Sequence, residues 1–458
     1  MTLGLPCGLL VAYYGDDFTG STDAMEAMTA AGVPTVLFLG VPDRQALARF
    51  PEMRCVGIAG SSRGRSPQWM ENELPQAFKA LAELGAPILH YKVCSTFDSS
   101  PTIGSIGKAI DLGTKTMRGR WSPSIVGAPR LKRYQVFGNL FASVDGVGHR
   151  LDRHPTMSRH PVTPMDEADL RLHLSQQTSR TIELIDMVQL RSPGADACVR
   201  QLQNQHVPVV MIDVLDQETL QVAGRLVWEH RGEGIFSASS SGLQYALTAH
   251  WRSEGWIPKE HSLPAASSVS VIAGVSGSCS PVTASQIRWA RDNGFHTERL
   301  QLERILDANT RGGEVVRASQ VAADALHGGR SAIVFSAEGP DDAAVITFDR
   351  VAADVGLSRQ DAARTVGVAL ADVMRSILNK AQLQRVVVAG GDSSGEVASA
   401  LDIDALTVAA TLAPGAPLCR AWSRLPERDG LEMVLKGGQM GGLGFFGLVK
   451  DGGGAARD

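Results

Sequence analysis

The sequence predicts an α/β protein of two domains, each a mostly parallel sheet flanked by helices, with an active-site cleft between them. Short apolar runs alternate with helical patterns that often end at a glycine, which is typical of parallel sheets covered on both faces. The 458 residues exceed what one domain usually holds. A polar stretch rich in Ser, Pro and Trp interrupts the alternation. We therefore predict a first domain at 1–247, a linker at 248–268, a second domain at 269–450 and a loose tail at 451–458.

The elements of the first half follow from local patterns. A buried apolar run ends at Tyr14, and a segment rich in Ala and Met at helical spacing ends at Gly32, a residue type that commonly terminates helices. The same alternation recurs down to about residue 237. The predicted strands are 9–14, 35–39, 55–59, 88–93, 134–137, 182–187, 209–212 and 234–237, and the predicted helices are 21–31, 71–84, 103–110 and 217–230.

Residues 113–165 fit this alternation poorly, because they hold many Pro, Gly, Arg and His residues. We interpret them as an irregular excursion that contributes to a site. Regular alternation returns in the second half of the chain. Its predicted strands are 269–273, 331–335, 385–389 and 431–435, and its predicted helices are 281–293 and 358–380.

The charge distribution argues against a nucleic-acid partner. The net charge is -4, and the 44 basic residues are spread along the chain. The densest basic cluster, Arg130, Lys132 and Arg133, is short and is typical of a solvated turn. A nucleic-acid footprint would need a larger patch of Lys and Arg.

Cysteine usage and hydropathy favour a reducing, cytoplasmic setting. The six cysteines form no CxxC pair, which disfavours a zinc site or a thioredoxin-like motif. No apolar stretch approaches the ~20 residues of a membrane helix, so no membrane partner is expected. The apolar run at 3–14 lacks a basic leader and precedes Asp16 and Asp17, so we interpret it as a buried strand and not as a signal peptide.

Polar side chains follow the predicted strands of the first domain, where ligands bind in parallel α/β sheets. Asp16 and Asp17 lie between Gly15 and Gly20. Paired carboxylates can accept hydrogen bonds from sugar hydroxyls or act as a general base, whereas a single acid would simply cap the next helix. Arg63 follows the strand at 55–59, where a guanidinium can bind a carboxylate, or can lie exposed in a turn.

The strand at 88–93 contains Lys92, and a charge inside a strand must be paired. The polar residues at the exit of this strand are Ser95, Thr96 and Asp98. The alternative interpretation is a helix start, with Ser99 or Ser100 as N-cap and Pro101 at the first helical position. Both interpretations can hold together.

The second domain has three strand exits typical of anion sites. Serines precede a helix that opens with Pro281, and two later exits are rich in glycine, which allows a phosphate to approach the backbone. Asp392 can hold Mg²⁺ through water. The alternative is a set of capped helices and tight turns. The candidate residues are Ser276, Ser278, Gly390, Gly391, Asp392, Ser393, Gly437 and Gly438.

Three other patterns carry less weight. The GxGxxG match at 442–447 opens no evident helix and has no acidic residue about 20 positions later, so we reject a dinucleotide fingerprint. The chain has no GxxxxGK[ST] phosphate loop. GxSxG matches at 60–64 and 391–395 leave a serine hydrolase as a rival, although nothing singles out its histidine.

Taken together, the motifs resemble the four-carbon acid sugar kinase family, long catalogued as a domain of unknown function. The resemblance extends in order over nearly the whole chain, and the motifs together are specific although each alone is weak. The matching segments are 14–23 (YGDDFTGSTD), 92–101 (KVCSTFDSSP), 160–165 (HPVTPM), 277–286 (GSCSPVTASQ), 390–395 (GGDSSG) and 436–441 (KGGQMG).

The resemblance implies an acid-sugar-binding first domain and an ATP-binding second domain. It implies phosphorylation of D-threonate, D-erythronate, L-threonate or 3-oxo-tetronate, with ATP and Mg²⁺ as cofactors. Two departures stand out: Ser393 replaces a threonine common in the family, and residues 127–141 (GAPRLKRYQVFGNLF) differ from its usual pattern. The second departure leaves the sugar open, and a branched acid such as 3-oxo-isoapionate is the alternative.

The resulting hypothesis assigns a role to each charged residue. The resemblance places Asp16, Asp17, Arg63, Lys92 and Asp98 on the substrate side, and we add Ser95 and Thr96. Asp17 and Lys92 are the predicted catalytic residues; Arg63 and Lys92 meet the substrate carboxylate, and Asp17 orients or deprotonates its hydroxyl. A serine hydrolase and a non-catalytic sugar-acid sensor remain rivals. A homo-oligomer also remains open.

Overall fold

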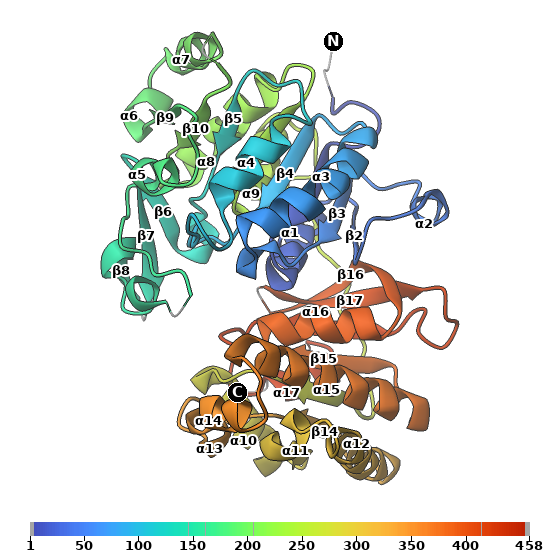
Figure 1. Ribbon diagram of the computed structural model, residues 1–458. Helices are drawn as coiled ribbons and strands as arrows, with labels where there is room; N and C mark the ends of the chain where they lie inside the picture. The colour runs from blue at the N-terminus through green and yellow to red at the C-terminus, as the bar shows by residue number, and fades with distance from the viewer. Residues whose placement is uncertain (1–3, 145, 161, 205, 414, 454–458) are drawn as a thin grey trace. The chain divides into compact units, whose positions relative to one another are not determined.

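The structure is a computed structural model that describes residues 4–453 apart from 145, 161, 205 and 414, and apart from the side chains of residues 392 and 393. The chain divides into two compact units, Met1–Ser262 and Leu263–Asp458. Figure 1 shows helices on both sides of the main sheet in each unit. The predicted tail at 451–458 lies outside the described residues from 454 onward.

The first unit is organised around five parallel strands in the order β11-β4-β1-β3-β2. Gly15 at the end of β1 pairs with Ala59 of β3 on one side and with Lys92 of β4 on the other. The residues that follow these three strands therefore meet at one edge of the sheet. The strands are β1 (Val11–Gly15), β2 (Thr35–Phe38), β3 (Cys55–Ala59), β4 (Ile88–Lys92) and β11 (Ile235–Ser239).

Helices flank this sheet because consecutive crossovers run in opposite directions. The connection from β1 to β2 passes one way across β3, and the connection from β3 to β4 returns across β1. Right-handed crossovers then place their helices on opposite faces. The helices are α1 (Phe18–Ala30), α2 (Arg44–Ala48), α3 (Pro67–Glu83), α4 (Ile106–Gly113), α5 (Leu170–Ser175), α6 (Met187–Leu190), α7 (Ala195–Leu202), α8 (Gln217–Glu229) and α9 (Gly242–Ser253).

Residues 113–165 are more regular than the sequence suggested. They contribute β5 (Ser122–Ser124) to a parallel sheet with β10 (Val209–Ile212) and β9 (Ile182–Ile185). They also form an antiparallel sheet of their own. The composition hid these strands, because two of them are short and only half-buried. The antiparallel strands are β6 (Arg133–Val136), β7 (Asn139–Val144) and β8 (Val147–Arg150).

Serine side chains join β5 to the edge strand β11. Ser122 and Ser124 donate hydrogen bonds to the carbonyls of Phe236 and Ala238 at 2.9 and 2.5 Å. In the opposite direction, Ser237 donates to the carbonyl of Pro123 at 2.8 Å. We call this row of hydroxyl contacts, formed by Ser122, Ser124 and Ser237, the serine seam. It ties the smaller parallel sheet to the main one through side chains.

Three predicted boundaries in this unit were wrong. Helix α3 begins four residues earlier than predicted, because Ser66 caps it by accepting from the N–H of Trp69 at 3.3 Å. Helix α4 is capped by Ser105, and not by Ser99 or Ser100. Helix α9 continues to Ser253, so the first residues of the predicted linker are helical.

The second unit has the strand order β16-β17-β18-β15-β12-β14-β13. Its five strands from β18 to β13 are parallel, whereas β16, β17 and β18 pair antiparallel. The strands are β12 (Ala273–Ser276), β13 (His296–Arg299), β14 (Ala332–Phe335), β15 (Arg385–Ala389), β16 (Ile403–Ala413), β17 (Ala416–Ser423) and β18 (Glu432–Lys436).

Helices α10 and α17 pack together, while α15 contacts both α12 and α16. The core beside α10 and α17 includes Ile287, Ile333, Val387 and Phe446, all fully buried. The helices are α10 (Pro281–Asp292), α11 (Leu302–Leu306), α12 (Arg311–His327), α13 (Ala343–Ile346), α14 (Phe348–Asp354), α15 (Arg359–Lys380), α16 (Gly391–Ala400) and α17 (Phe445–Asp451).

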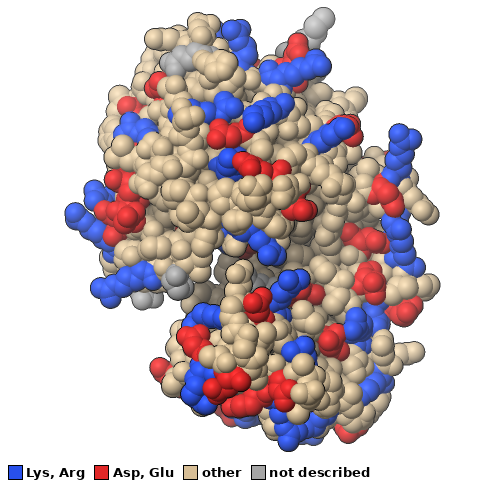
Figure 2. Space-filling model, in the orientation of Figure 1, with Lys and Arg blue, Asp and Glu red and all other residues tan. Residues whose placement is uncertain are grey.

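Two further predictions are corrected here. The first strand of this unit, β12, begins at Ala273, where the sequence predicted its end, because Val269 donates instead to the carbonyl of Lys450 at the end of the chain's last helix. The GxGxxG segment at 442–447 does open a helix, α17. On the face visible in Figure 2, basic and acidic side chains are interspersed, so the described part of that face shows no extended region of one charge. Among the described residues, no helix combines the length and apolarity needed to cross a membrane.

Candidate functional site

The exits of β1 and β3 bring two carboxylates and a guanidinium together. Arg63 donates to both oxygens of Asp16, at 3.1 Å from Nε and 2.8 Å from Nη2. Its Nη1 donates to Asp17 at 2.7 Å. Asp17 also caps α1, since its other oxygen accepts from the N–H of Gly20 at 2.7 Å. The structure thus shows Asp17 as a helix cap that also binds Arg63, and its predicted role toward a substrate stays a prediction.

The backbone fixes Arg63 in this position. Its N–H donates to the carbonyl of Asp16 at 3.0 Å. Behind it, Gly104 approaches so closely that a Cβ there would lie 2.2 Å from the Arg63 carbonyl oxygen, and its φ of +61° also favours glycine. The backbone of Arg63 is consequently fixed, and its guanidinium is held by Asp16 and Asp17.

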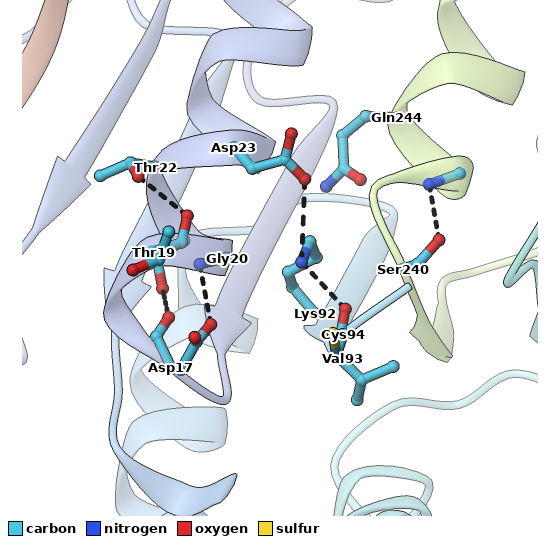
Figure 3. Close-up of polar contacts among 12 residues, drawn as sticks. Asp17, Thr19, Gly20, Thr22, Asp23, Lys92, Val93, Cys94, Ser240 and Gln244 are labelled. Atoms are coloured by element: carbon cyan, nitrogen blue, oxygen red, sulfur yellow. Dashed lines mark hydrogen bonds and ion pairs between the residues drawn. The ribbon is translucent and has the colours of Figure 1, made fainter. Parts of the chain in front are cut away.

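Lys92 is almost completely buried at the end of β4. Its ammonium donates to the carbonyl of Val93 at 2.9 Å and lies 3.9 Å from a carboxylate oxygen of Asp23. Figure 3 shows Lys92 between Asp23 of α1 and Gln244 of α9. A Cβ at Gly20 would lie 2.8 Å from the ammonium nitrogen, so glycine is needed there. Asp23 belongs to the motif at 14–23 (YGDDFTGSTD), but the sequence analysis did not select Asp23 as a site residue.

Two buried polar atoms near this cluster have no hydrogen-bond partner in the described part of the chain. They are Thr19 Oγ1, in the first turn of α1, and Gln244 Oε1, whose amide nitrogen donates to His90. Buried polar atoms are normally satisfied. A ligand with hydroxyl groups would supply the missing partners.

Asp98 forms a second acidic position after β4. It accepts from the hydroxyl of Thr96 at 2.6 Å and from that of Thr163 at 3.4 Å. The N–H of Thr163 also donates to His160 Nδ1 at 3.1 Å, which brings the HPVTPM segment to this exit. Ser95 is half-buried in the intervening turn. Sequence analysis did not select Thr163 and His160 as site residues, although the motif that contains them was its signal.

Charge interactions connect these groups into one cluster. Burial raises the pKa of Asp16 to about 6, while the charge of Arg63 opposes this and that of Asp17 adds to it. Burial alone would raise the pKa of Asp98, but Arg63 and the Thr96 hydrogen bond outweigh it and lower this pKa. The charge of Lys92 acts on Asp16 in the same direction as Arg63. The structure thus brings together the five charged residues predicted for the first domain.

In the second unit, serines follow β12 and lead into α10. Ser276 and Ser278 are buried, and Ser280 caps the helix by accepting from the N–H of Val282 at 3.2 Å. Pro281 occupies the first turn, as expected. The adjacent strand β15 ends in register with β12, since Ser276 pairs with Ala389. Two helices, α10 and α16, therefore begin at neighbouring strand exits.

A third segment, residues 437–442, lies against α10. Thr283 donates to the carbonyl of Gly438 at 2.8 Å. Gln286 donates from one amide nitrogen to the carbonyls of Met440, Gly441 and Gly442, each at 3.0 Å. A Cβ at Gly438 would lie 2.6 Å from Ser278 Oγ. This contact brings two of the predicted nucleotide-side segments together.

Lys436 is a candidate site residue that the sequence analysis missed. It is completely buried at the end of β18, and its ammonium donates to Thr283 Oγ1 at 2.9 Å and to the Gly437 carbonyl at 3.1 Å. Burial lowers its pKa to about 8, and no ion pair is found for it among the described residues. Its signal was the one that singled out Lys92: a lysine at the end of a buried strand.

These features suit a polyphosphate. Helix N-termini bind anions, and Gly390 adopts a φ of +125° where α16 begins. The buried cation of Lys436 lies beside them, because the N–H of Gly390 donates to the Lys436 carbonyl at 2.9 Å. The side chains of Asp392 and Ser393 lie outside the described residues, so the Mg²⁺ prediction for Asp392 stays a prediction. Within the described residues, no group of three His, Cys, Asp or Glu side chains could hold a metal ion.

Two family comparisons cover most of the chain. Residues 11–247 match the family described as a sugar-binding N-terminal domain. Residues 273–446 match the family described as a nucleotide-binding C-terminal domain. The acidic and basic cluster lies within the first match, and the segments 276–281, 390–395 and 437–442 lie within the second.

Several characterised relatives align over nearly their whole length. The 3-oxo-isoapionate kinase of Paraburkholderia graminis is 68% identical over 98% of this chain and 95% of its own. The 3-oxo-tetronate kinase of Methylobacterium radiotolerans is 30% identical over 98% of this chain and 99% of its own. That of Pseudomonas savastanoi is 28% identical over 95% and 96%.

Solved structures share the fold. A crystal structure from Salmonella typhimurium aligns with a TM-score of 0.77 and 22% identity over 96% of this chain and 98% of that one. A Haemophilus influenzae protein aligns with a TM-score of 0.71 and 22% identity over 96% and 99%. From the two domain matches and the relatives together, the chain belongs to the four-carbon acid sugar kinase family.

Proposed function

We propose that this protein is an ATP-dependent kinase that phosphorylates a hydroxyl of 3-oxo-isoapionate. The observation that carries this is the 68% identity to the Paraburkholderia graminis 3-oxo-isoapionate kinase over 98% of the chain. The sequence alone favoured a linear four-carbon acid and kept the branched acid as the alternative. The identity to the 3-oxo-tetronate kinases is far lower, at 26–30%. We therefore rank the branched acid first and the linear four-carbon acid second.

In this proposal the first unit binds the sugar acid. Asp17 accepts a hydrogen bond from the reacting hydroxyl and orients it. Arg63 was predicted to bind the substrate carboxylate, but its three donor contacts go to Asp16 and Asp17. We therefore assign Arg63 the role of holding Asp17 in place. The Lys92 ammonium offsets negative charge that develops near the hydroxyl.

The second unit binds ATP. The N-termini of α10 and α16, with Gly391 and the glycines at 437–438, receive the phosphate groups through backbone N–H donors. Lys436 contributes a nearby positive charge. Mg²⁺, bound with the nucleotide, would neutralise charge on the phosphates, with Asp392 as its proposed water-mediated ligand.

Transfer forms a bond from the substrate oxygen to the γ-phosphorus and breaks the bond to ADP. The hydroxyl proton leaves toward Asp17 or solvent. Positioning and charge neutralisation supply most of the catalysis in such reactions. Transfer requires the bound hydroxyl and the bound γ-phosphate to meet during turnover.

The test is a coupled assay of ADP release with purified protein and ATP. We expect 3-oxo-isoapionate to exceed 3-oxo-tetronate, threonate and erythronate in kcat/KM by on the order of 10-fold or more. Equal or better use of 3-oxo-tetronate would overturn the substrate assignment. No ADP release with any acid would overturn the kinase assignment.

Asp17→Asn separates the roles of this residue. Asparagine caps helices as well as aspartate, so α1 should persist while kcat falls by on the order of 100-fold or more. The matched control is Asp43→Asn, because Asp43 caps α2 through the same kind of contact, at 2.7 Å from the N–H of Ala46. Full turnover by the Asp17 variant would contradict the assigned role.

A further inference from the structure

An arginine outside the acidic cluster has donors that the folded chain leaves unused. Arg133 opens β6, and its Nε is buried without a hydrogen-bond partner in the described part of the chain. Its Nη1 donates to the carbonyls of Leu131 and Lys132 at 3.1 and 3.2 Å. These contacts fix the Nη1 side of the guanidinium. The Nε side has no partner among the described residues, and it is an edge that can bind a carboxylate in a bidentate manner.

The backbone holds Arg133 rigidly. Arg133 and Ala128 exchange backbone hydrogen bonds of 3.2 and 2.9 Å, and Arg133 also pairs with Ala142 of β7. Between them, Lys132 adopts a left-handed φ of +56° that reverses the chain. The guanidinium thus occupies a set position before ligand binds.

His154 supplies a second unused donor near Arg133. It is buried, and its Nδ1 accepts from the N–H groups of Thr156 and Met157, each at 3.2 Å. The ring proton therefore lies on Nε2, which has no partner among the described residues. Burial lowers the pKa of His154, and the charge of Arg133 lowers it further. Strand pairing links the two residues, because Arg133 pairs with Ala142, Ala142 pairs with His149, and the rings of His149 and His154 lie 5.9 Å apart between centroids. Two unused N–H donors at this sheet indicate a missing acceptor.

No described carboxylate forms an ion pair with Arg133, in contrast to Arg63. Besides His154, the thiol of Cys94 lies within range of the charge of Arg133. Cys94 Sγ lies 2.9 Å from Thr96 Oγ1, which in turn lies 2.6 Å from Asp98 Oδ1, so Cys94 lies beside the acidic cluster. The carboxylate of a substrate would be repelled by Asp16, Asp17 and Asp98, and attracted to a cation that lies apart from them.

We propose that Arg133, assisted by His154, binds the carboxylate of the sugar acid, so that the chain of the substrate extends past Cys94 toward Asp17. This rests on the proposed function, and it deepens that function by assigning the end of the substrate that each region holds.

The test compares Arg133→Met and Arg133→Lys with the exposed control Arg153→Met. Two charge-assisted hydrogen bonds support an increase in KM for 3-oxo-isoapionate on the order of 100-fold in Arg133→Met, with the KM for ATP unchanged. Arg133→Lys keeps the charge but loses the fork, so we expect an intermediate KM. The control should match the wild type.

A neutral substrate analogue distinguishes this role from a structural one. Wild type should prefer the acid over its carboxamide, and Arg133→Met should lose that preference. The melting temperature of Arg133→Met without ligand should not fall, because the substitution removes a cation that has no ion-pair partner among the described residues. The rise in melting temperature that the acid alone causes in the wild type should disappear in this variant.

The two proposals fail differently. An active wild type with an unchanged KM in Arg133→Met, or without preference for the acid, would overturn the Arg133 assignment and leave the kinase intact. A wild type that is stabilised by the acid through Arg133 but releases no ADP would overturn the kinase and leave the binding site. If Arg133→Met does not fold, Arg133→Lys takes its place in the comparison. An unchanged KM and an unchanged preference for the acid in Arg133→Lys would also overturn the assignment of Arg133 to the substrate carboxylate.

Discussion

Gly20 of α1 lies against the charged cluster. A Cβ there would lie 2.4 Å from Asp17 Oδ1 and 2.8 Å from the Lys92 nitrogen. Gly20→Ala should therefore displace both predicted catalytic groups. We expect a loss of about 1–3 kcal/mol of stability and a fall in kcat on the order of 100-fold, measured by thermal unfolding and by the ADP assay.

Gly312→Ala is the matched control, because Gly312 lies in α12 with open space around its Cβ position. Alanine should stabilise that helix by up to about 1 kcal/mol and leave kcat unchanged. A Gly20→Ala variant that keeps full turnover would show that the cluster tolerates movement of Asp17 and Lys92.

At this scale, residue type and strand exit were enough to select Asp16, Asp17, Arg63, Lys92 and Asp98. Their partners were not predictable, because the contact between Arg63 and Asp17 spans 46 positions and depends on the register of β1 with β3. Arg133 was seen only as part of a solvated basic turn. Its unused donors become apparent only when β6 and its neighbours are placed.

Helix α10 positions the segment 437–442 through one buried side chain. Gln286 donates to three successive carbonyls of that segment. Gln286→Leu should leave these carbonyls unsatisfied and release the segment, so the Kd for ATP should rise on the order of 10-fold. Isothermal titration with ATP measures this, and binding of the sugar acid should be unchanged.

Ser285→Ala is the control, since Ser285 belongs to the same helix but donates to the carbonyl of Pro281 within it. An unchanged ATP affinity in Gln286→Leu would argue against a nucleotide role for 437–442. Weakened binding of the acid as well would indicate general misfolding, which the thermal transition would report.

The end of β10 is tied to the turn between β6 and β7 by a buried carboxylate. Asp213 accepts from the N–H groups of Gly138 and Met187 at 3.0 and 3.2 Å, and also from that of Phe137. Burial raises its pKa to about 6, although these hydrogen bonds oppose the rise. Between pH 3.8, the ordinary pKa of an aspartate, and about pH 6, the Asp213 carboxyl is protonated to a greater extent in the folded state than in the unfolded state.

Stability from this group is therefore greatest in acid and falls as pH rises toward about 6. We expect the free energy of unfolding of the wild type, relative to Asp213→Asn, to fall by up to about 3 kcal/mol between pH 4 and pH 7. Urea unfolding of both proteins at each pH measures it. A difference that stays constant with pH would show that Asp213 is not perturbed.

Element by element, the apolar strands were the predictable ones. The strand at 55–59 and that at 385–389 match β3 and β15, because continuous burial leaves a plain apolar run. The strand β13 (HTER) lies at the sheet edge and is polar, so it was missed. The long antiparallel pair β16 and β17 was missed because the prediction followed the parallel alternation.

On the scale of the whole molecule, the chain consists of two compact units joined by a segment without helix or strand between α9 and β12. Lys259 is exposed within it. Brief digestion with trypsin should cleave first after Lys259, because exposed irregular backbone fits a protease best. Mass spectrometry of the fragments identifies the cut.

Lys259→Gln should delay the appearance of both fragments. A first cut inside a helix or strand of either unit would contradict the expected order of exposure. Alternation, length and one polar stretch were enough to predict two α/β domains. The smaller sheets of the first unit could not be predicted, because their strands pair across intervals that no local pattern records.

The serine seam is a connection between the two parallel sheets of the first unit that side-chain substitutions can change. It links β11, which pairs with the lysine-bearing β4, to β5 and hence to β10, whose end anchors the hairpin that carries Arg133. Replacing one of these serines by alanine would remove one hydroxyl contact and leave every peptide bond of both strands in place. Successive substitutions of that kind would shift the hairpin that carries Arg133 relative to Asp17 in small steps. Substrates of different length or branching could then be accommodated without altering any charged group.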